Sequence, residues 1–362
     1  MKDVIRYEPR AANKREPLVR KVLEWMPASI VSHIRGIQSP TGRTAEGWFS
    51  LVPFLPGQFV EKPREEVYGK ILEAIHLGRD RGAEVAGLGG YTSVVGDAGV
   101  TLASRLPDMT VTSGNSYTVA TALQGAVEAA RRLGIEIGDS RVAVVGATGS
   151  IGSVCARYMA PRAREMVLVA RNRARLDRLA ETIRVESGRE PYIAADVASG
   201  VREADIVITA TSSTGNIIRA DYIRPGALIC DVSLPHDVCR EVASARPDVL
   251  VIEGGLVELP GDVDFGFYFG YPPKVSLACM AETILLALEG RHENFSLGRG
   301  ITLEQVEEIS RLADRHGFKL AGFRSFDHLV TDEEIEAVRD AARRRRQGTH
   351  VFSVDPVREG AV

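Results

Sequence analysis

Short apolar runs alternate with amphipathic segments through the middle of the chain. The runs are rich in β-branched residues and nearly continuous, and they occupy 142–145, 167–170, 192–194, 206–210, 228–232 and 249–252. Continuous apolar runs are typical of parallel strands that are buried on both faces. The pattern therefore predicts an α/β protein with a Rossmann-type, doubly wound parallel sheet over residues 136–258.

A second pattern precedes this region. Two strand-like runs, 30–37 and 48–55, flank the turn sequence Ser-Pro-Thr-Gly at 39–42. A helix is expected after Pro63, since apolar residues recur at helical spacing from Val67 to Gly78. Two short strands, 85–88 and 109–112, each lead into a glycine loop, and a long helix is predicted over 116–133.

The sequence pattern of the C-terminal third predicts helices. An aromatic-rich connection, 259–273, is followed by an apolar helix over 276–289, and a helix over 302–317 that opens with the capping box of Thr302 and Gln305. The last helix, 332–346, has acids at its start and arginines at its end, as the helix dipole favours. We predict four segments: an N-terminal α/β substrate domain (1–135), a nucleotide-binding domain (136–258), a helical return to the substrate domain (259–330), and a C-terminal helix and tail (331–362).

The strand at 142–145 ends in a glycine motif of spacing G-x-x-G-x-x-G, followed by a helix-forming segment. In a dinucleotide-binding fold the first glycine allows the tight turn, the second lets a diphosphate approach the backbone, and the third lets the helix pack on the strand. The free N–H groups of the new helix then face the phosphates. The predicted cofactor contacts in this turn are Gly146, Thr148, Gly149, Ser150, Ile151 and Gly152.

The end of the second strand distinguishes the two nicotinamide cofactors. NAD sites place an acid here for the ribose 2′-hydroxyl, whereas this chain has Arg171, Asn172 and Arg173. Guanidinium groups can hold a 2′-phosphate by charge and paired hydrogen bonds. We therefore predict NADPH, with Thr209, Thr211 and Ser212 at the fourth strand end beside its nicotinamide half.

Composition narrows the function classes. The 362 residues have 44% hydrophobic and 26% charged residues, which is ordinary for a globular protein. The net charge of −3 gives no reason to expect nucleic acid as a partner. No apolar run reaches the roughly 20 residues of a membrane span, and residues 1–20 lack the apolar core of a signal peptide. We expect a cytoplasmic protein with free thiols, no metal site, and a homo-oligomer as an open alternative.

Three groups compete as the reactive centre. Cys279 lies in the first turn of an apolar helix, where free N–H groups lower a thiol's pKa, although a cysteine on such a helix is also typical of a core. A polar cluster over 112–117, with Ser113 and Asn115, offers donors for a carbonyl. His236 and His292 are the third choice. Cys155 and Cys230 look like core residues, and Cys239 like a surface residue.

The motifs together resemble the long-chain acyl-(acyl-carrier-protein) reductases best known from cyanobacteria. The stretches that carry the resemblance are 88–93, 112–118, 133–135, 142–153, 170–172, 254–255, 278–279, 281–282, 294–296, 298–299 and 316–318. The resemblance implies an NADPH-dependent reduction of a fatty-acyl thioester, carried by acyl carrier protein or coenzyme A, to an aldehyde. It implies an acyl-cysteine intermediate on Cys279. We further predict Ser113 and Asn115 as catalytic residues, whose loop would donate hydrogen bonds to the developing oxyanion.

Two other functions remain open. A dehydrogenase of a small hydroxy or amino acid would need no covalent step and would take its base from Tyr117, Asp231 or a histidine. A nucleotide-sensing protein would bind the cofactor without turnover. An apolar tunnel that ends at Cys279 favours the thioester reductase, whereas a small polar pocket favours the dehydrogenase. The aromatic stretch 265–271 is expected either to line that tunnel or to pack between domains.

Overall fold

A computed structural model describes residues 13–95, 97–213, 216–326 and 328–347. The chain divides into two compact units. Unit 1 comprises 1–115, 258–300 and 308–319, and unit 2 comprises 116–257, 301–307 and 320–362. The predicted boundary at residue 135 therefore differs from the observed division at 115, because α7 (Asn115–Leu133) belongs almost wholly to unit 2, as does the C-terminal helix.

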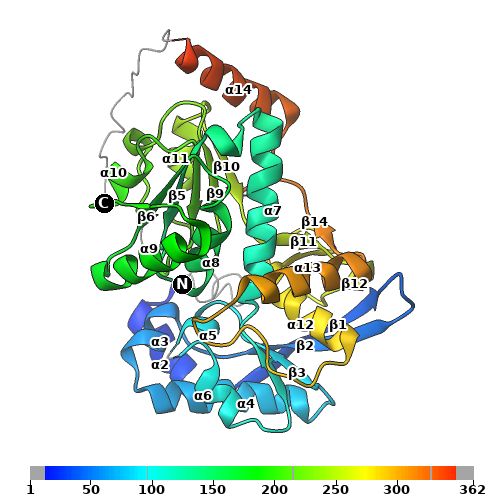
Figure 1. The fold of residues 1–362 in the computed structure, drawn as a ribbon. Coiled ribbons are helices and arrows are strands. Elements are labelled where there is room, and N and C mark those ends of the chain that lie inside the picture. The colour runs from blue at the N-terminus through cyan, green and yellow to red at the C-terminus, as the bar shows by residue number, and fades with distance from the viewer. Residues whose placement is uncertain (1–12, 96, 214–215, 327, 348–362) are drawn as a thin grey trace. The chain divides into compact units, whose positions relative to one another are not determined.

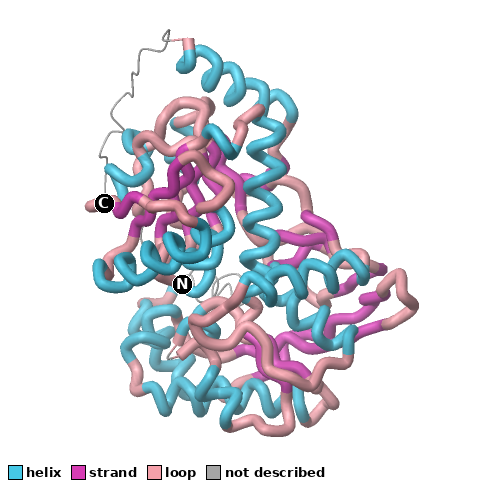
Figure 2. Tube along the Cα trace, in the orientation of Figure 1, coloured by secondary structure: helices cyan, strands magenta, loops and turns pink. Residues whose placement is uncertain are grey.

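Unit 2 contains the predicted parallel sheet. Its six strands have the order β10-β9-β8-β5-β6-β7, which is the doubly wound arrangement with β5 and β8 at the centre. The bounds are β5 Arg141–Val145, β6 Glu165–Val169, β7 Tyr192–Ile193, β8 Ile206–Thr209, β9 Leu228–Asp231 and β10 Leu250–Glu253. These strands (magenta in Figure 2) have helices alongside them, and the fold class predicted from the apolar runs is confirmed.

Both faces of the sheet are buried. Ala143 and Val145 of β5 belong to one apolar cluster, while Val142 and Val144 point to the opposite face and are also fully buried. Successive side chains of a strand point to opposite faces of the sheet. A strand that has helices on both faces therefore needs apolar residues at every position. The helices of the unit are α8 Ser150–Met159, α9 Arg173–Ser187, α10 Val197–Val201, α11 Arg240–Ala245 and α14 Asp332–Arg346, with 3-10 turns at Ile137–Asp139 and Ala220–Tyr222.

Unit 1 is a mixed structure of small sheets and helices. The hairpin of β1 (Ser29–Gln38) and β2 (Thr44–Leu51) turns at 39–43, as predicted, and β12 (Gly261–Asp264) pairs with β1. Short strands β3 (Val85–Gly87) and β4 (Thr110–Thr112) pair in parallel. The helices are α2 Glu16–Trp25, α3 Pro56–Glu61, α4 Arg64–Arg79, α5 Tyr91–Val94, α6 Val100–Ser104 and α12 Ala278–Glu289.

The segment before α12 corrects one prediction. Residues 276–277 were expected to be helical, but Val275–Leu277 form strand β13 and the helix begins at Ala278. Valine and leucine suit an extended segment, and tertiary pairing overrides a helical period read from so few residues. As a result, Cys279 is the second residue of α12, still within the first turn as predicted.

The remaining elements lie where the chain passes from one unit to the other. They are β11 (Leu256–Glu258), α13 (Leu303–His316) and β14 (Lys319–Leu320), and two strands of the C-terminal segment, β15 (Arg324–Ser325) and β16 (His328–Leu329), pair in unit 2. The predicted capping box is present, since Gln305 N–H donates to Thr302 Oγ1 at 3.2 Å and Thr302 N–H to Gln305 Oε1 at 3.0 Å.

Candidate functional site

The glycine turn of unit 2 has the geometry of a dinucleotide-binding loop. Gly146 has φ +81°, and a Cβ there would lie 2.4 Å from the carbonyl oxygen of Ala210. A Cβ at Gly152 would lie 2.4 Å from the carbonyl oxygen of Gly146, so only glycine lets α8 pack this closely on the turn. The turn therefore directs the N-terminus of α8, from Ser150, beyond the carboxyl end of β5, which is a phosphate-binding arrangement.

The strand neighbouring β5 ends in basic side chains. Register places Val169 opposite Val145, so the segment from Arg171 begins beside the glycine turn. Asn172 caps α9 by accepting a hydrogen bond from Arg175 N–H at 3.0 Å. Arg173 pairs with Asp177 at 2.9 Å and is largely exposed, and Arg171 is exposed as well. These residues fit a cofactor that carries a 2′-phosphate, because no acid occupies the strand end.

Two buried aspartates organise the ends of β8 and β9. Asp237 accepts hydrogen bonds from the hydroxyls of Thr209, Thr211 and Ser233, that of Thr211 at 2.6 Å. Asp231 accepts from the backbone N–H groups of Ser233, Asp237 and Val238 at 2.9–3.0 Å. The Thr209 hydroxyl, predicted beside the cofactor, is thus buried against Asp237, whereas Ser212 is exposed. The carboxylate network, which sequence reasoning missed, instead shapes the backbone of the 210–213 loop.

His236 lies at the same end of the sheet, half buried between two acids. Its Nδ1 is 3.6 Å from Asp231 and its Nε2 is 3.8 Å from Glu253. Burial lowers the pKa of His236, but the hydrogen bond and charge of Asp231 outweigh this effect, so the pKa is raised. Burial raises the pKa of Glu253. His292, by contrast, is exposed in unit 1, and Tyr117 is buried.

Cys279 lies in the wall of the large cavity of unit 1. The cavity has a volume of about 1300 Å³ and a mainly apolar lining, drawn from α2, β2, α4, β3 and α12. From the segment that carries Cys279, the lining includes Leu277, Met280, Thr283, Ile284 and Ala287. A cavity of this size and polarity suits a long apolar ligand better than a small polar acid.

Burial has the largest effect on the pKa of the Cys279 thiol. Burial raises the pKa of Cys279 to about 11, although the backbone N–H groups of Met280 and Cys279 stabilise the thiolate. The expected lowering by the helix start is therefore present but smaller than the desolvation, and the nearby charge of Glu282 acts in the same direction as burial. A nucleophilic role then requires that the proton leaves during attack.

The loop that follows β4 lies directly against Cys279. Gly114 has φ +74°, and a Cβ there would be 2.3 Å from the Cα of Cys279. The Ser113 hydroxyl donates to the carbonyl of Ser296, and the Asn115 side chain is largely buried. The structure thus brings together Cys279 and the predicted 113–115 loop within unit 1.

A buried acid also belongs to this cluster. Glu282 is fully buried one turn after Cys279, and it accepts a hydrogen bond from the Thr112 hydroxyl. Thr112 Oγ1 in turn accepts from Gly114 N–H at 3.0 Å. Sequence reasoning did not select Glu282, although its position as the sole acid in the first two turns of an otherwise apolar helix was a usable signal.

The aromatic stretch does not line the cavity. Phe265, Phe267 and Phe269 surround Phe49 of β2, with ring centroids 5.0–6.2 Å apart. None of residues 265–271 belongs to the cavity lining, and the rings pack inside unit 1 rather than between domains, so both predicted roles differ from the observed one. The other cysteines behave as expected, since Cys155 and Cys230 are buried and Cys239 is half exposed.

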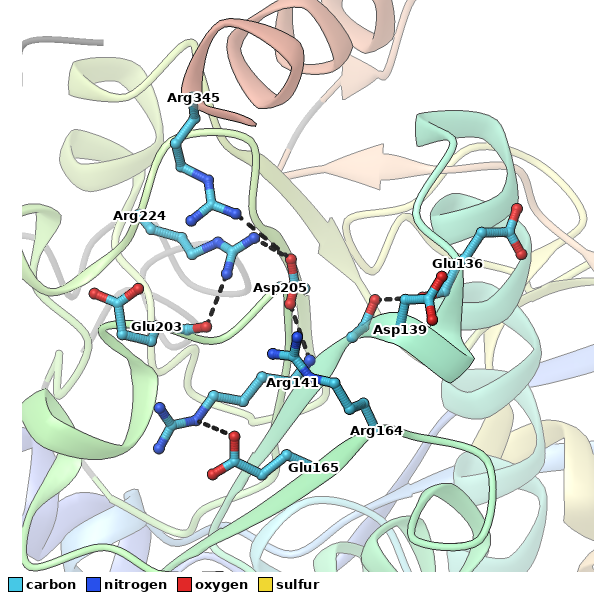
Figure 3. A pocket seen from close by; sticks show the side chains of 10 residues that line it. Glu136, Asp139, Arg141, Arg164, Glu165, Glu203, Asp205, Arg224 and Arg345 are labelled. Carbon is cyan, nitrogen blue, oxygen red and sulfur yellow. Dashed lines mark hydrogen bonds and ion pairs between the residues drawn. The ribbon is translucent and has the colours of Figure 1, made fainter. Parts of the chain in front are cut away.

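A smaller hollow of about 500 Å³ lies at the amino ends of the parallel strands, away from the glycine turn. Its charged side chains pair with each other: Arg224 and Arg345 approach Asp205, and Arg141 approaches Glu165 at 3.5 Å (Figure 3). Four arginines and five acids line it, so its charges are nearly balanced. The ion pairs around the hollow therefore join elements of unit 2. The lining has no excess charge that would attract a ligand.

One family model matches part of the chain. Residues 128–252 match the model described as Shikimate / quinate 5-dehydrogenase. This range covers the C-terminal end of α7 and nearly all of the parallel sheet, which is the nucleotide-binding portion of unit 2. The match does not extend to the cavity or to Cys279.

Two relatives align over most of the chain. The long-chain acyl-[acyl-carrier-protein] reductase of Synechococcus elongatus is 32% identical over 308 residues, which cover 81% of this chain and 87% of the relative. The aminotransferase PigE of Serratia sp. is 32% identical over 83% of this chain, and the chain spans only 35% of that protein's length. Among solved structures, the nucleotide-binding domain of glutamyl-tRNA reductase from Thermoplasma volcanium is 24% identical over 36% of this chain and 84% of that chain, with a TM-score of 0.28.

Proposed function

The chain belongs to the family of the long-chain acyl-[acyl-carrier-protein] reductases, and from this premise we propose that it reduces a fatty-acyl thioester to an aldehyde. It is an oxidoreductase, and its cofactor is NADPH. The observation that carries the proposal is the mainly apolar cavity of about 1300 Å³ with Cys279 in its wall. The glycine turn and the arginines after β6 supply the fitting cofactor residues, and NADPH bound there provides the hydride.

Cys279 is the proposed nucleophile. Its sulfur forms a bond to the acyl carbonyl carbon, the bond from that carbon to the carrier sulfur breaks, and the carrier thiolate takes up the proton that Cys279 loses. Because the pKa of Cys279 is raised to about 11, the proton has to leave the sulfur as the new bond forms, and the departing carrier sulfur ends the exchange as a thiol. The backbone N–H groups of Cys279 and Met280, which face the sulfur, are suited to stabilise charge on the acyl oxygen.

The second half of the reaction releases the product. A hydride supplied by bound NADPH would add to the acyl-Cys279 carbonyl carbon, and the carbon–sulfur bond of Cys279 would then break as the aldehyde forms. The aldehyde leaves, and the Cys279 thiolate takes a proton from water. The sum is acyl thioester, NADPH and a proton converted to aldehyde, free carrier thiol and NADP⁺. We assign Ser113 and Asn115 to positioning, because the Ser113 hydroxyl is already engaged by Ser296.

The decisive experiment is incubation with a long-chain acyl-coenzyme A and NADPH, with detection of aldehyde by gas chromatography and of an acyl adduct by mass spectrometry. We expect the adduct on Cys279 when NADPH is omitted, and no aldehyde from Cys279→Ser. Cys239→Ser is the matched control, since Cys239 is also half exposed but lies in unit 2. Full aldehyde formation by Cys279→Ser would refute the covalent step.

The rival function is an NADP-dependent dehydrogenase of a small hydroxy or amino acid. Against it, Asp231 is buried and bonded to three N–H groups, and the cavity beside Cys279 is apolar. Oxidation of small hydroxy acids with NADP⁺, without reaction of acyl thioesters, would favour the rival. Thioester-dependent oxidation of NADPH would exclude both this rival and a sensor without turnover.

A further inference from the structure

Four large apolar side chains are exposed along the first described helix of unit 1. Leu18, Val22, Trp25 and Met26 belong to or follow α2. They are four of the eleven exposed large apolar side chains in the described ranges, and Trp25 is the most exposed of them, at 79%. Such a cluster differs from the scattered apolar residues that any surface contains, and we call it the α2 patch.

Helix α2 carries its exposed apolar side chains on one face. Leu18, Val22 and Trp25 follow the i, i+4, i+7 spacing of one helical face. The opposite face holds Arg20, which pairs with Glu61 of α3, and Glu24, which accepts from Gln58 at 2.9 Å. The helix is thus fixed to α3 through polar contacts on one face, while Leu18 and Val22 of its apolar face line the cavity and are also exposed to solvent.

The patch borders the acyl-sized cavity. Leu18, Val22 and Met26 are exposed and also belong to the cavity lining, so the cavity opens at the patch. An apolar chain passing through this opening would contact apolar side chains on both sides. Trp25 lies on the same helical face and does not line the cavity.

Basic residues flank the apolar stripe. Lys14 and Lys21 lie four residues before and three residues after Leu18, and Arg15 is exposed at the start of the helix. The Lys21 ammonium is 5.7 Å from the centroid of the Trp25 ring. Long basic side chains around an apolar face with an exposed tryptophan are suited to the interface of an anionic bilayer, where the ring and ammonium meet headgroups.

We propose that the α2 patch docks on an anionic lipid surface, so that the cavity of unit 1 opens toward lipid. The helix has 10 residues and is about 15 Å long, and no helix of the described ranges is long and apolar enough to cross a membrane. Docking would therefore be interfacial and reversible. The purpose of this arrangement rests on the proposed function, because a long-chain aldehyde partitions into lipid rather than water.

Trp25 reports on the proposal directly. The chain has two tryptophans, so Trp48→Phe leaves Trp25 as the single indole. We expect its emission to shift to shorter wavelength on vesicles of phosphatidylcholine with phosphatidylglycerol, and to stay unchanged on phosphatidylcholine alone at high salt. Sedimentation with the anionic vesicles should fall at least about fivefold in Trp25→Ser and in Met26→Ser. The matched control is Val185→Ser, an exposed valine on α9.

The assay separates this proposal from the catalytic one. Cys279→Ser should sediment with vesicles as the unaltered protein does, since vesicle binding needs no turnover. Trp25→Ser should keep its NADPH oxidation with acyl-coenzyme A in the absence of lipid. Equal sedimentation of all variants would overturn the docking proposal. So would an emission shift produced by an acidic carrier protein or by rising protein concentration and not by vesicles.

Discussion

Gly114 and Cys279 are packed so closely that a Cβ on Gly114 would lie 2.3 Å from the Cα of Cys279. The loop that carries Gly114 also has φ +74° at this residue, which side chains other than glycine rarely adopt. The backbone of Cys279 and the 113–115 loop are therefore in direct contact in unit 1. The glycine is required here by proximity and by conformation together.

Gly114→Ala should reduce both stability and acylation of Cys279. We expect a loss of about 2–4 kcal/mol in the free energy of unfolding, because backbone atoms at 2.3–2.6 Å can move only with their elements. Urea unfolding and the rate of acyl-adduct formation measure the two effects. Gly134→Ala is the matched control: Gly134 has φ +67° with no atom within 4 Å of the added Cβ, so it should lose only about 1 kcal/mol.

Glu282→Gln should lower the pKa of Cys279. The negative charge of Glu282 is one of the causes that raise this pKa to about 11, whereas a glutamine can still accept the hydrogen bond of Thr112. The thiolate would then form at lower pH, so the pH profile of alkylation by iodoacetamide should shift to lower pH. The profile is measured in a Cys239→Ser background. Cys155 and Cys230 are buried, so alkylation in this background reports on Cys279.

Glu289→Gln, at the other end of α12, is the control for this charge effect and should leave the profile unchanged. A profile that moves to higher pH in Glu282→Gln would contradict the electrostatic assignment. If Glu282 also orients the loop through Thr112, the acylation rate at a fixed thiolate fraction should fall in Glu282→Ala and recover in Glu282→Gln.

The doubly wound sheet was predictable because its strands are buried on both faces. The run 142–145 has no polar residue and the run 206–210 has only Thr209, so neither is confused with a loop, and each is followed by a clear helix or turn signal. The glycine turn was predictable for the same local reason, since close approach at Gly146 and Gly152 admits no side chain.

The polar networks were not predictable, because they join residues that are distant in sequence. Asp237 meets Thr209 across 28 positions, and Glu282 meets Thr112 across 170. The thiol pKa was predicted in the wrong direction for a related reason: helix position is local, whereas burial depends on the whole cavity wall. The contact of Thr209 with the cofactor stays a prediction. Its hydroxyl donates a hydrogen bond to Asp237.

Arg171→Ala should weaken the binding of NADPH more than the binding of NADH. A guanidinium on the 2′-phosphate contributes about 1.5–3 kcal/mol, so the KM for NADPH should rise about tenfold or more while that for NADH changes little. Arg178→Ala, an exposed arginine farther along α9, controls for the general loss of charge. Equal effects on both cofactors would show that Arg171 does not recognise the 2′-phosphate.

Asp205→Ala should destabilise unit 2 without affecting the cofactor. Asp205 pairs with Arg224, both side chains being only 12–13% exposed, and also accepts from Arg141 N–H at 2.9 Å (Figure 3). Removing the acid leaves a buried guanidinium without its charge partner, which should cost about 3–5 kcal/mol in the free energy of unfolding. Glu165→Ala removes the more exposed partner of Arg141 and should cost below about 1 kcal/mol. Because this cluster lies at the amino ends of the strands, fluorescence titration should give the same Kd for NADPH in both variants, and a weakened Kd in Asp205→Ala alone would mean that the cluster shapes the glycine turn.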